Sequence, residues 1–124
     1  MQRRFRLFVE DMLNAAETLV ELAGELSGEE LASDIARKDR ILWNFTVLGE
    51  ASRNIPDAIK ATYPGINWRK AADFRNRIVH GYTSVHWKIV HHTIHKQLPP
   101  MIAELKLMLE DPALPDDFLD IDLV

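Results

Sequence analysis

The chain has 124 residues, 47% of them hydrophobic and 27% charged, and it contains no cysteine. This predicts a single globular domain and excludes both disulfides and zinc sites built on thiolates. The net charge of −4 excludes a protein that coats nucleic acid through its overall field, because such proteins are strongly basic. No stretch approaches the roughly 20 apolar residues of a membrane span, and acidic residues interrupt any signal peptide, so we expect a cytoplasmic protein without membrane contact.

The first half of the chain predicts two long amphipathic helices. Apolar residues recur at spacings of three and four from Phe5 to about Glu25, and again after Asp34 until Pro56 limits the pattern. Between them, Ser27-Gly28-Glu29-Glu30 has the form of a capping box that opens a new helical stretch. Residues 56–62 are expected to form one short helical turn, because proline suits a first helical position.

The second half predicts two more helices. Asn67 can cap a helix that runs through Ile78, and Gly81 is a plausible terminator for it. A last helix is expected over residues 84–110. Pro99-Pro100 lies in its middle and removes two backbone donors, so we expect a kink or break there.

These elements predict an all-α fold of four to five helices in an up-and-down bundle. No segment shows the alternation of a β-strand. We expect residues 1–110 to form the helical domain. Residues 111–124 carry two prolines and dense acid, which predicts a flexible tail.

Charge is segregated along the chain. Between Asn67 and Lys96 the basic residues outnumber the single acidic residue Asp73, and all five histidines lie in the same stretch. From Met101 onward acidic residues dominate. A local site for an anion is therefore compatible with an acidic total.

The run Arg75-Asn76-Arg77-Ile78-Val79-His80-Gly81-Tyr82 concentrates groups that handle phosphate. Arginine offers a planar fork of donors to phosphate oxygens, and histidine can give or take a proton near neutral pH. On one straight helix Asn76 and His80 share a face, but Arg75 and His80 do not. Their convergence requires that Arg75 wraps round, that the helix ends near His80, or that a second subunit completes the site. The alternative is a purely structural role, in which the histidine at the helix end stabilises the C-terminal dipole of the helix.

The order of these residues resembles the Arg-x4-6-His and His-x-Tyr signature of HepT-like toxins in the HEPN superfamily. The surroundings are similar too: Leu48-Gly49-Glu50-Ala51 with Ile55-Pro56 resembles the Gly-Glu-Ala helix of that family. Tyr63-Pro64 and Trp68-Arg69 resemble the stretch before its catalytic helix. The resemblance covers most of the chain between about Phe8 and Leu109.

The resemblance implies a metal-independent endoribonuclease toxin that forms a homodimer and needs no cofactor. Arg75 and His80 would be the catalytic pair, with Asn76 and Arg77 orienting the phosphate. The implied system is a type VII-like toxin–antitoxin pair, in which a nucleotidyltransferase antitoxin of the MNT type attaches AMP to Tyr82. RNA is the implied substrate, cut by attack of the ribose 2′-hydroxyl on the adjacent phosphorus.

Two other functions stay open at this point. The chain could be a non-catalytic module that presents nucleotide or substrate to a nucleotidyltransferase, or a purely structural helical adaptor. His91, His92 and His95 have spacings that can bind a metal on a helix, but the run lacks a carboxylate, which favours a solvated face or a modest RNA contact. Helical spacing favours core or dimer packing over base stacking for the main aromatic residues, namely Trp43, Trp68, Trp87, Phe45 and Phe74.

Overall fold

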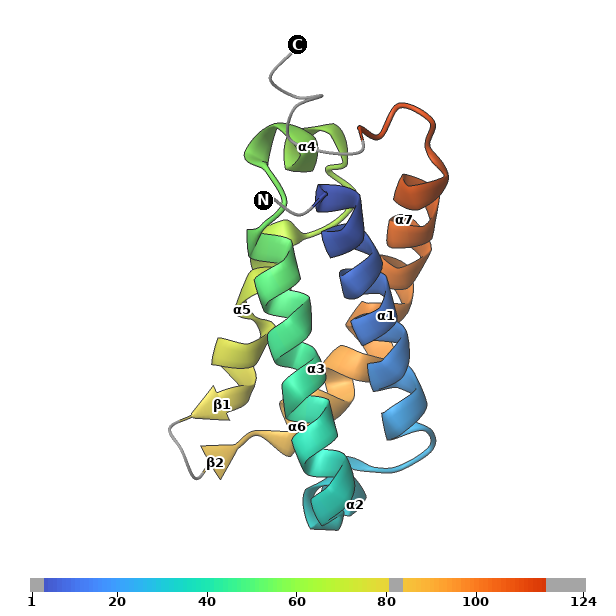
Figure 1. Ribbon diagram of the computed structural model, residues 1–124. Coiled ribbons are helices and arrows are strands. Elements are labelled where there is room, and N and C mark those ends of the chain that lie inside the picture. The colour runs from blue at the N-terminus through green and yellow to red at the C-terminus, as the bar shows by residue number, and fades with distance from the viewer. Residues whose placement is uncertain (1–3, 81–83, 116–124) are drawn as a thin grey trace.

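The computed structural model describes residues 4–80 and 84–115. Its long helices stand side by side as an upright bundle, with α5 and α7 on opposite sides of the α1–α3 pair (Figure 1). The expected all-α bundle is confirmed. Its long helices are α1 (Phe5–Ala23), α3 (Ile35–Arg53), α5 (Trp68–Ile78) and α7 (Leu98–Glu110).

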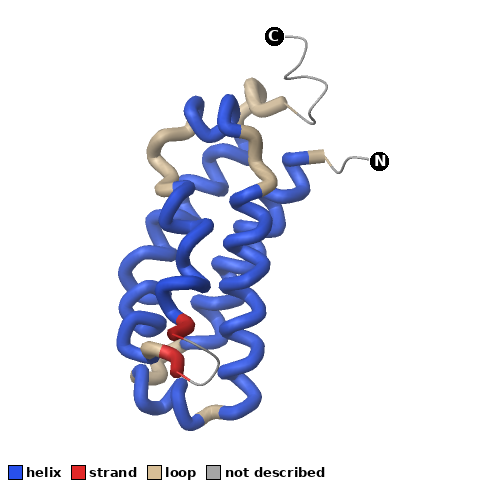
Figure 2. The backbone as a smooth tube through the Cα atoms, turned by 90° about the vertical axis from the view of Figure 1, so that its left-hand side faces the viewer, coloured by secondary structure: helices blue, strands red, loops and turns tan. Residues whose placement is uncertain are grey.

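Shorter elements join the long helices: α2 (Gly28–Ser33), α4 (Asp57–Thr62), α6 (Trp87–His92) and the π-helical turn η1 (Thr93–Gln97). A two-residue antiparallel pair, β1 (Val79–His80) and β2 (Ser84–Val85), lies at one end of the bundle (Figure 2). The sequence predicted no alternating strand, and this short pair was therefore missed. Two residues are too few to show an alternating pattern, and the His86 N–H donates to the Ile78 carbonyl at 3.0 Å, which closes the reversal.

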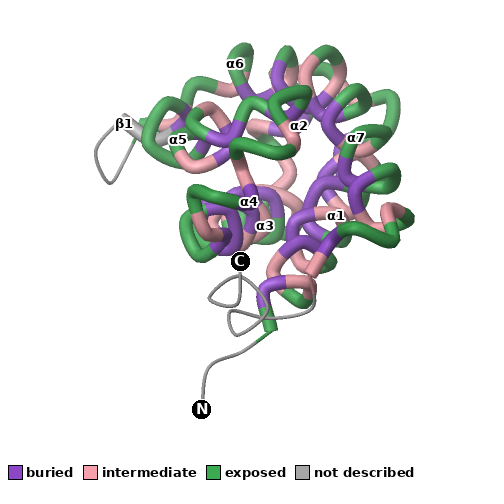
Figure 3. Tube along the Cα trace, turned by 90° about the horizontal axis from the view of Figure 1, so that it is seen from above, coloured by how far each residue is buried: buried purple, intermediate pink, exposed green. Residues whose placement is uncertain are grey.

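The core lies between the helices, and the exposed residues face outward around it (Figure 3). Phe45 of α3 and Phe74 of α5 meet edge to face, with ring centroids 5.9 Å apart. Trp68 is also buried, as its helical spacing indicated. Trp43 is the exception among the aromatic residues, because 66% of its surface is exposed. Core packing is therefore excluded for Trp43.

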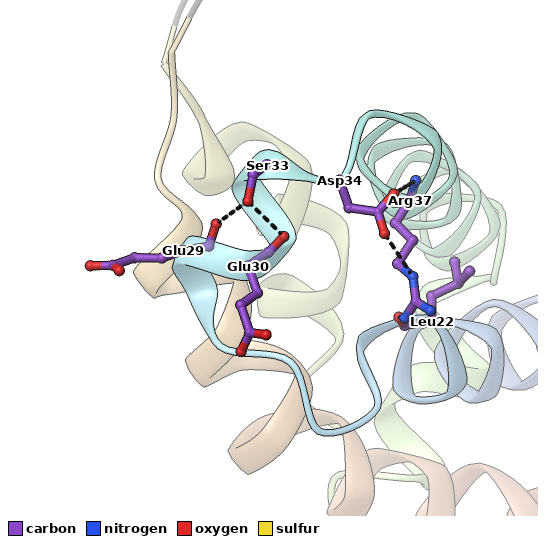
Figure 4. A network of polar contacts seen from close by, with 6 residues as sticks. All are labelled: Leu22, Glu29, Glu30, Ser33, Asp34 and Arg37. Carbon is purple, nitrogen blue, oxygen red and sulfur yellow. Dashed lines mark hydrogen bonds and ion pairs between the residues drawn. The ribbon is translucent and has the colours of Figure 1, made fainter.

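The corner between α1, α2 and α3 is fixed by side chains at helix ends (Figure 4). The expected capping box is present: Ser27 accepts from the Glu30 N–H, and Glu30 accepts from the Ser27 N–H. Asp34 caps α3 by accepting from the Arg37 N–H at 3.1 Å. The Arg37 guanidinium also pairs with Asp34 and donates to the Leu22 carbonyl at the end of α1. These contacts set the direction in which α3 leaves the corner.

The last helix is interrupted where the two prolines predicted it. The N–H of Leu98 donates to the Thr93 carbonyl, five residues back, which is the π-helical spacing. Pro99 and Pro100 then occupy the first turn of α7, where their missing donors leave no helical bond broken. The N-terminal boundary was wrong: the helix begins at Trp87, because Ser84 and Val85 form β2.

The chain beyond α7 is packed against the bundle as far as it is described. Leu114 is buried, and Arg6 donates to the Leu109 and Leu114 carbonyls. Asp111 accepts a 2.8 Å hydrogen bond from the Tyr63 hydroxyl. Burial and this carboxylate raise the pKa of Tyr63 to about 12. The predicted flexible tail thus includes a stretch, 111–115, that is anchored to the bundle.

Within residues 4–80 and 84–115, none of the helices combines the length and the apolar character that crossing a membrane requires.

Candidate active site between α3 and α5

Helix α5 is positioned by its cap and by its apolar face. The Asn67 side chain accepts from the Lys70 N–H at 3.0 Å, which confirms the expected cap. Phe74 and Ile78 face the core. The intervening residues Arg75, Asn76 and Arg77 are consequently exposed on the outer surface.

Helix α3 approaches α5 unusually closely. A Cβ at the buried Gly49 would lie 3.2 Å from the Ala72 carbonyl oxygen, so glycine is what permits the approach. One turn later the buried Ser52 hydroxyl donates to the Trp68 carbonyl at 3.2 Å. Arg53 donates to the Ala72 carbonyl at 3.1 Å and pairs with Glu50 at 2.8 Å. Three residues of α3 thereby hold the backbone of α5.

A groove of about 370 Å³ runs between the two helices. Its polar walls bring Arg75 and Asn76 of α5 beside residues of α3 that are distant in sequence. The lining comprises Trp43, Thr46, Gly49, Glu50, Arg53, Ala72, Arg75 and Asn76. The groove thus combines two guanidiniums, one amide and one carboxylate at the surface.

The two arginines of the groove differ in their partners. Arg53 is engaged by Glu50 and by the Ala72 carbonyl. The exposed Arg75 guanidinium has no hydrogen-bond or ion-pair partner among residues 4–80 and 84–115. A guanidinium in that state can offer its donor fork to an incoming anion without first breaking a contact.

The predicted extent of the helix, through Ile78, is confirmed, but His80 lies beyond the helix and not on its face. Helix α5 ends at Ile78, and His80 lies in β1, paired with Ser84. The predicted i,i+4 relation of Asn76 and His80 is therefore wrong. The helix ends two residues before His80, which is the condition that one of the three routes to convergence requires. Tyr82 and the predicted terminator Gly81 lie outside the described residues.

Arg77 does not line the groove, although the sequence placed it with Asn76 as a phosphate-orienting residue. It is exposed two residues after Arg75, where the helical rotation turns its side chain to another face. Any contact of Arg77 with a substrate would therefore come from outside the groove.

The second histidine segment has a different character. The rings of His91 and His95 pack against each other, with centroids 4.3 Å apart and their planes inclined at 39°. Burial, followed by the neighbouring His91, lowers the pKa of His95 below its ordinary value, and its buried Nε2 has no hydrogen-bond partner in the described part of the chain. Within that part, no three histidine or carboxylate side chains are grouped as a metal would require.

Comparison with known proteins identifies the family. The Ribonuclease HepT-like family matches residues 12–108, which is most of the chain. The chain belongs to this family. The matched span contains α3, α5 and the whole groove between them.

Individual relatives agree with this assignment. The chain is 29% identical over 101 residues to a protein named "Probable ribonuclease HepT" from Thermococcus cleftensis, covering 82% of this chain and 92% of that protein. It is 26% identical to a "Putative RNase" from Caldanaerobacter subterraneus, over 85% of this chain and 94% of the relative. A "Putative RNase" from Methanocaldococcus jannaschii is 23% identical, with 86% and 88% covered. No solved structure matches the chain.

Reasoning from sequence missed the wall of the groove that α3 provides. Glu50, Arg53, Thr46 and Trp43 lie more than twenty residues before Arg75, and spacing alone does not bring them together. One signal was available, because Gly49 lies inside a predicted helix. A glycine there lowers helix stability, and it is typical of a position where another backbone approaches closely.

Proposed function

We propose that this protein is a metal-independent endoribonuclease toxin and that the α3–α5 groove is where it binds the RNA phosphate. Membership of a ribonuclease family supports the activity. The observation that supports the location is the exposed Arg75 guanidinium beside Asn76 in the groove, which has no partner in the part of the chain that the structure describes. Family membership disfavours the two rivals, a non-catalytic presenting module and a structural adaptor.

The proposed reaction uses the nucleophile that RNA itself carries. The ribose 2′-oxygen loses its proton to His80 and forms a bond to the adjacent phosphorus. The bond from phosphorus to the 5′-oxygen breaks, and that oxygen takes up a proton from the protonated His80 of the partner subunit, which acts as the acid. The products are a 2′,3′-cyclic phosphate and a 5′-hydroxyl. Arg75 stabilises the charge that grows on the phosphorane oxygens, and Asn76 orients the phosphate.

The test is RNA cleavage by the purified protein, with and without EDTA. We expect cleavage that EDTA does not abolish, and products whose 5′ ends accept phosphate from a polynucleotide kinase without prior dephosphorylation. Intact RNA, or loss of cleavage on chelation, would contradict the proposal. The presenting-module alternative predicts intact RNA in both arms.

The active form is proposed to be a homodimer whose two-fold axis lies beside Trp43. A tryptophan that is 66% exposed is unusual on a monomer surface and is typical of interface anchors. A second hollow of about 200 Å³, distinct from the α3–α5 groove, lies beside it and is lined also by Phe8, Val47 and Asn54. An exposed ring beside such a hollow is the self-complementary shape that an isologous interface needs, and it leaves the α3–α5 groove open to RNA.

The dimer is tested by light scattering on Trp43→Ala beside Leu107→Ala. Leu107 is 61% exposed on α7, at the side of the bundle away from α5, and serves as the matched control (Figure 1). We expect Trp43→Ala to be monomeric and inactive and Leu107→Ala to remain a dimer. A monomeric wild type that cleaves RNA would overturn the dimer.

The proposed regulator is a nucleotidyltransferase antitoxin that transfers AMP from ATP to the Tyr82 oxygen and releases pyrophosphate. Support comes from the sequence position, two residues after His80. A bulky anion there would repel the RNA phosphate. Mass spectrometry of the protein coexpressed with such a partner should find AMP on Tyr82, and Tyr82→Phe should stay toxic. A modified but fully active protein would contradict this mode of inhibition.

A further inference from the structure

Arg53 is the second cation of the groove, and it is held in a fixed orientation. It is the last residue of α3. Its Nη1 donates to Glu50 Oε1 at 2.8 Å, and its Nη2 donates to the Ala72 carbonyl oxygen at 3.1 Å. These bonds tie one guanidinium to two helices. The side chain nevertheless keeps 48% of its surface exposed.

This arrangement leaves donors available to a ligand. A guanidinium carries five N–H groups, and the two contacts above use only some of them. Because the side chain is already oriented, binding an anion requires little further loss of conformational freedom. Arg53 is therefore prepared to bind a phosphate.

The two cations stand at different positions along the groove, so each can bind a phosphate of its own. Arg53 is anchored at Ala72, and Arg75 follows one helical turn later on the same helix. One turn rises about 5 Å along the axis, so the two guanidiniums flank different positions along the groove. A strand that places its scissile phosphate at Arg75 would present its neighbouring phosphate toward Arg53.

We propose that Arg53 is a second phosphate-binding residue, which holds the RNA strand one nucleotide away from the bond that is cut. This inference rests on the ribonuclease function proposed above. Arg53 positions the substrate and takes no part in the chemical step. Glu50 fixes the fork of Arg53 and offsets part of its charge, which keeps the groove from holding the product too tightly.

A purely structural clip between α3 and α5 is the alternative, and it makes different predictions. If Arg53 only joined α3 to α5, its loss would lower the stability of the fold and leave the electrostatic part of RNA binding unchanged. Each phosphate neutralised on a single strand lowers the slope of log affinity against log salt by about 0.7. The salt dependence of binding therefore separates a phosphate contact from a clip.

The experiment measures the affinity of full-length protein for a 2′-O-methyl oligoribonucleotide, which lacks the nucleophile, at several salt concentrations. The variants are Arg53→Gln, Arg53→Lys, Glu50→Gln and Lys106→Gln. Lys106 is an exposed cation on α7 that pairs with Glu17, so it is the matched control. Thermal melting reports on folding in parallel.

Arg53→Gln is expected to weaken binding and to reduce the magnitude of the salt slope by about 0.7. Arg53→Lys should keep the slope, Glu50→Gln should bind more tightly than wild type, and Lys106→Gln should match wild type. With cleavable RNA, Arg53→Gln should raise KM while kcat changes little.

An unchanged slope in Arg53→Gln would overturn the inference, as would a Glu50→Gln variant that binds as weakly as Arg53→Gln. If Arg53→Gln does not fold, the Glu50→Gln and Arg53→Lys results decide alone. Wild-type protein that cleaves RNA while Arg53→Gln behaves identically would refute only this inference. Wild-type protein that neither binds nor cleaves RNA would refute the proposed function as well.

Discussion

Two regions of this molecule carry side chains of the kind that bind phosphate or transfer protons, and they differ in how those side chains are engaged. At the end of α5, Arg75 and Asn76 are exposed on a groove, and the Arg75 side chain has no partner within residues 4–80 and 84–115. In the α6–η1 segment, the rings of His91 and His95 pack against each other at a tilt and the Nε2 of His95 is buried. The comparison teaches that the availability of a side chain, rather than its type, distinguishes the candidate site.

The largest expected effect separates the histidine that follows α5 from the histidines of the α6–η1 segment. His80→Ala should lower the rate of RNA cleavage by a factor of about 10² or more, because it removes the group proposed to take the proton from the 2′-hydroxyl. His92→Ala changes an exposed residue of α6 and should leave the rate within a few-fold of wild type. Equal losses in both variants would show that the α6–η1 histidines belong to the site.

The next effect concerns the backbone contact that forms the groove. Gly49→Val should destabilise the protein by about 1–3 kcal/mol, because a β-branched side chain must push the Ala72 carbonyl and α5 away. Cleavage should fall as well, since the groove loses its shape. Thermal melting and the cleavage rate measure the two effects. Gly24→Ala is a poor control, because Gly24 has a φ of 49°.

The sequence was sufficient to predict the helices, and also those helix ends that are set by capping side chains or prolines close by in the chain. Helical spacing, the Ser27–Glu30 capping box, the Asn67 cap and the break before Pro99 were all found in the structure. Each depends on residues within one or two turns. Two of the predicted site residues, Arg75 and Asn76, both line the groove.

The rest depends on tertiary contacts that no local pattern encodes. The pairing of β1 with β2 after Ile78 was not predicted, because two residues on each strand are too few to form a pattern in the sequence. Arg53 enters the site only because Gly49 lets α3 approach α5. Trp43 fits the helical pattern of a core residue but faces outward.

The smallest expected effect concerns the α6–η1 segment and the dependence of folding stability on pH. The pKa of His95 is lowered from 6.5 by burial and by His91. The unfolded chain therefore binds a proton more readily than the folded one, so stability is retained above about pH 6.5 and falls as the pH drops below it. Melting temperatures from pH 7.5 to 5 should show a shallower decline for His95→Gln than for wild type. Parallel curves would contradict this origin of the acid sensitivity.

The central claim is that the Arg75 guanidinium contacts the phosphodiester that is cut. The most direct measurement is the single-turnover rate of RNA cleavage for Arg75→Ala beside Arg69→Ala. Both residues are exposed arginines of α5, but only Arg75 lines the groove. Arg75→Ala should be slower by about 10²- to 10³-fold, as for the loss of one donor to a charged transition state, while Arg69→Ala keeps a rate close to wild type. Equal rates for the two variants would place the chemistry elsewhere on the molecule.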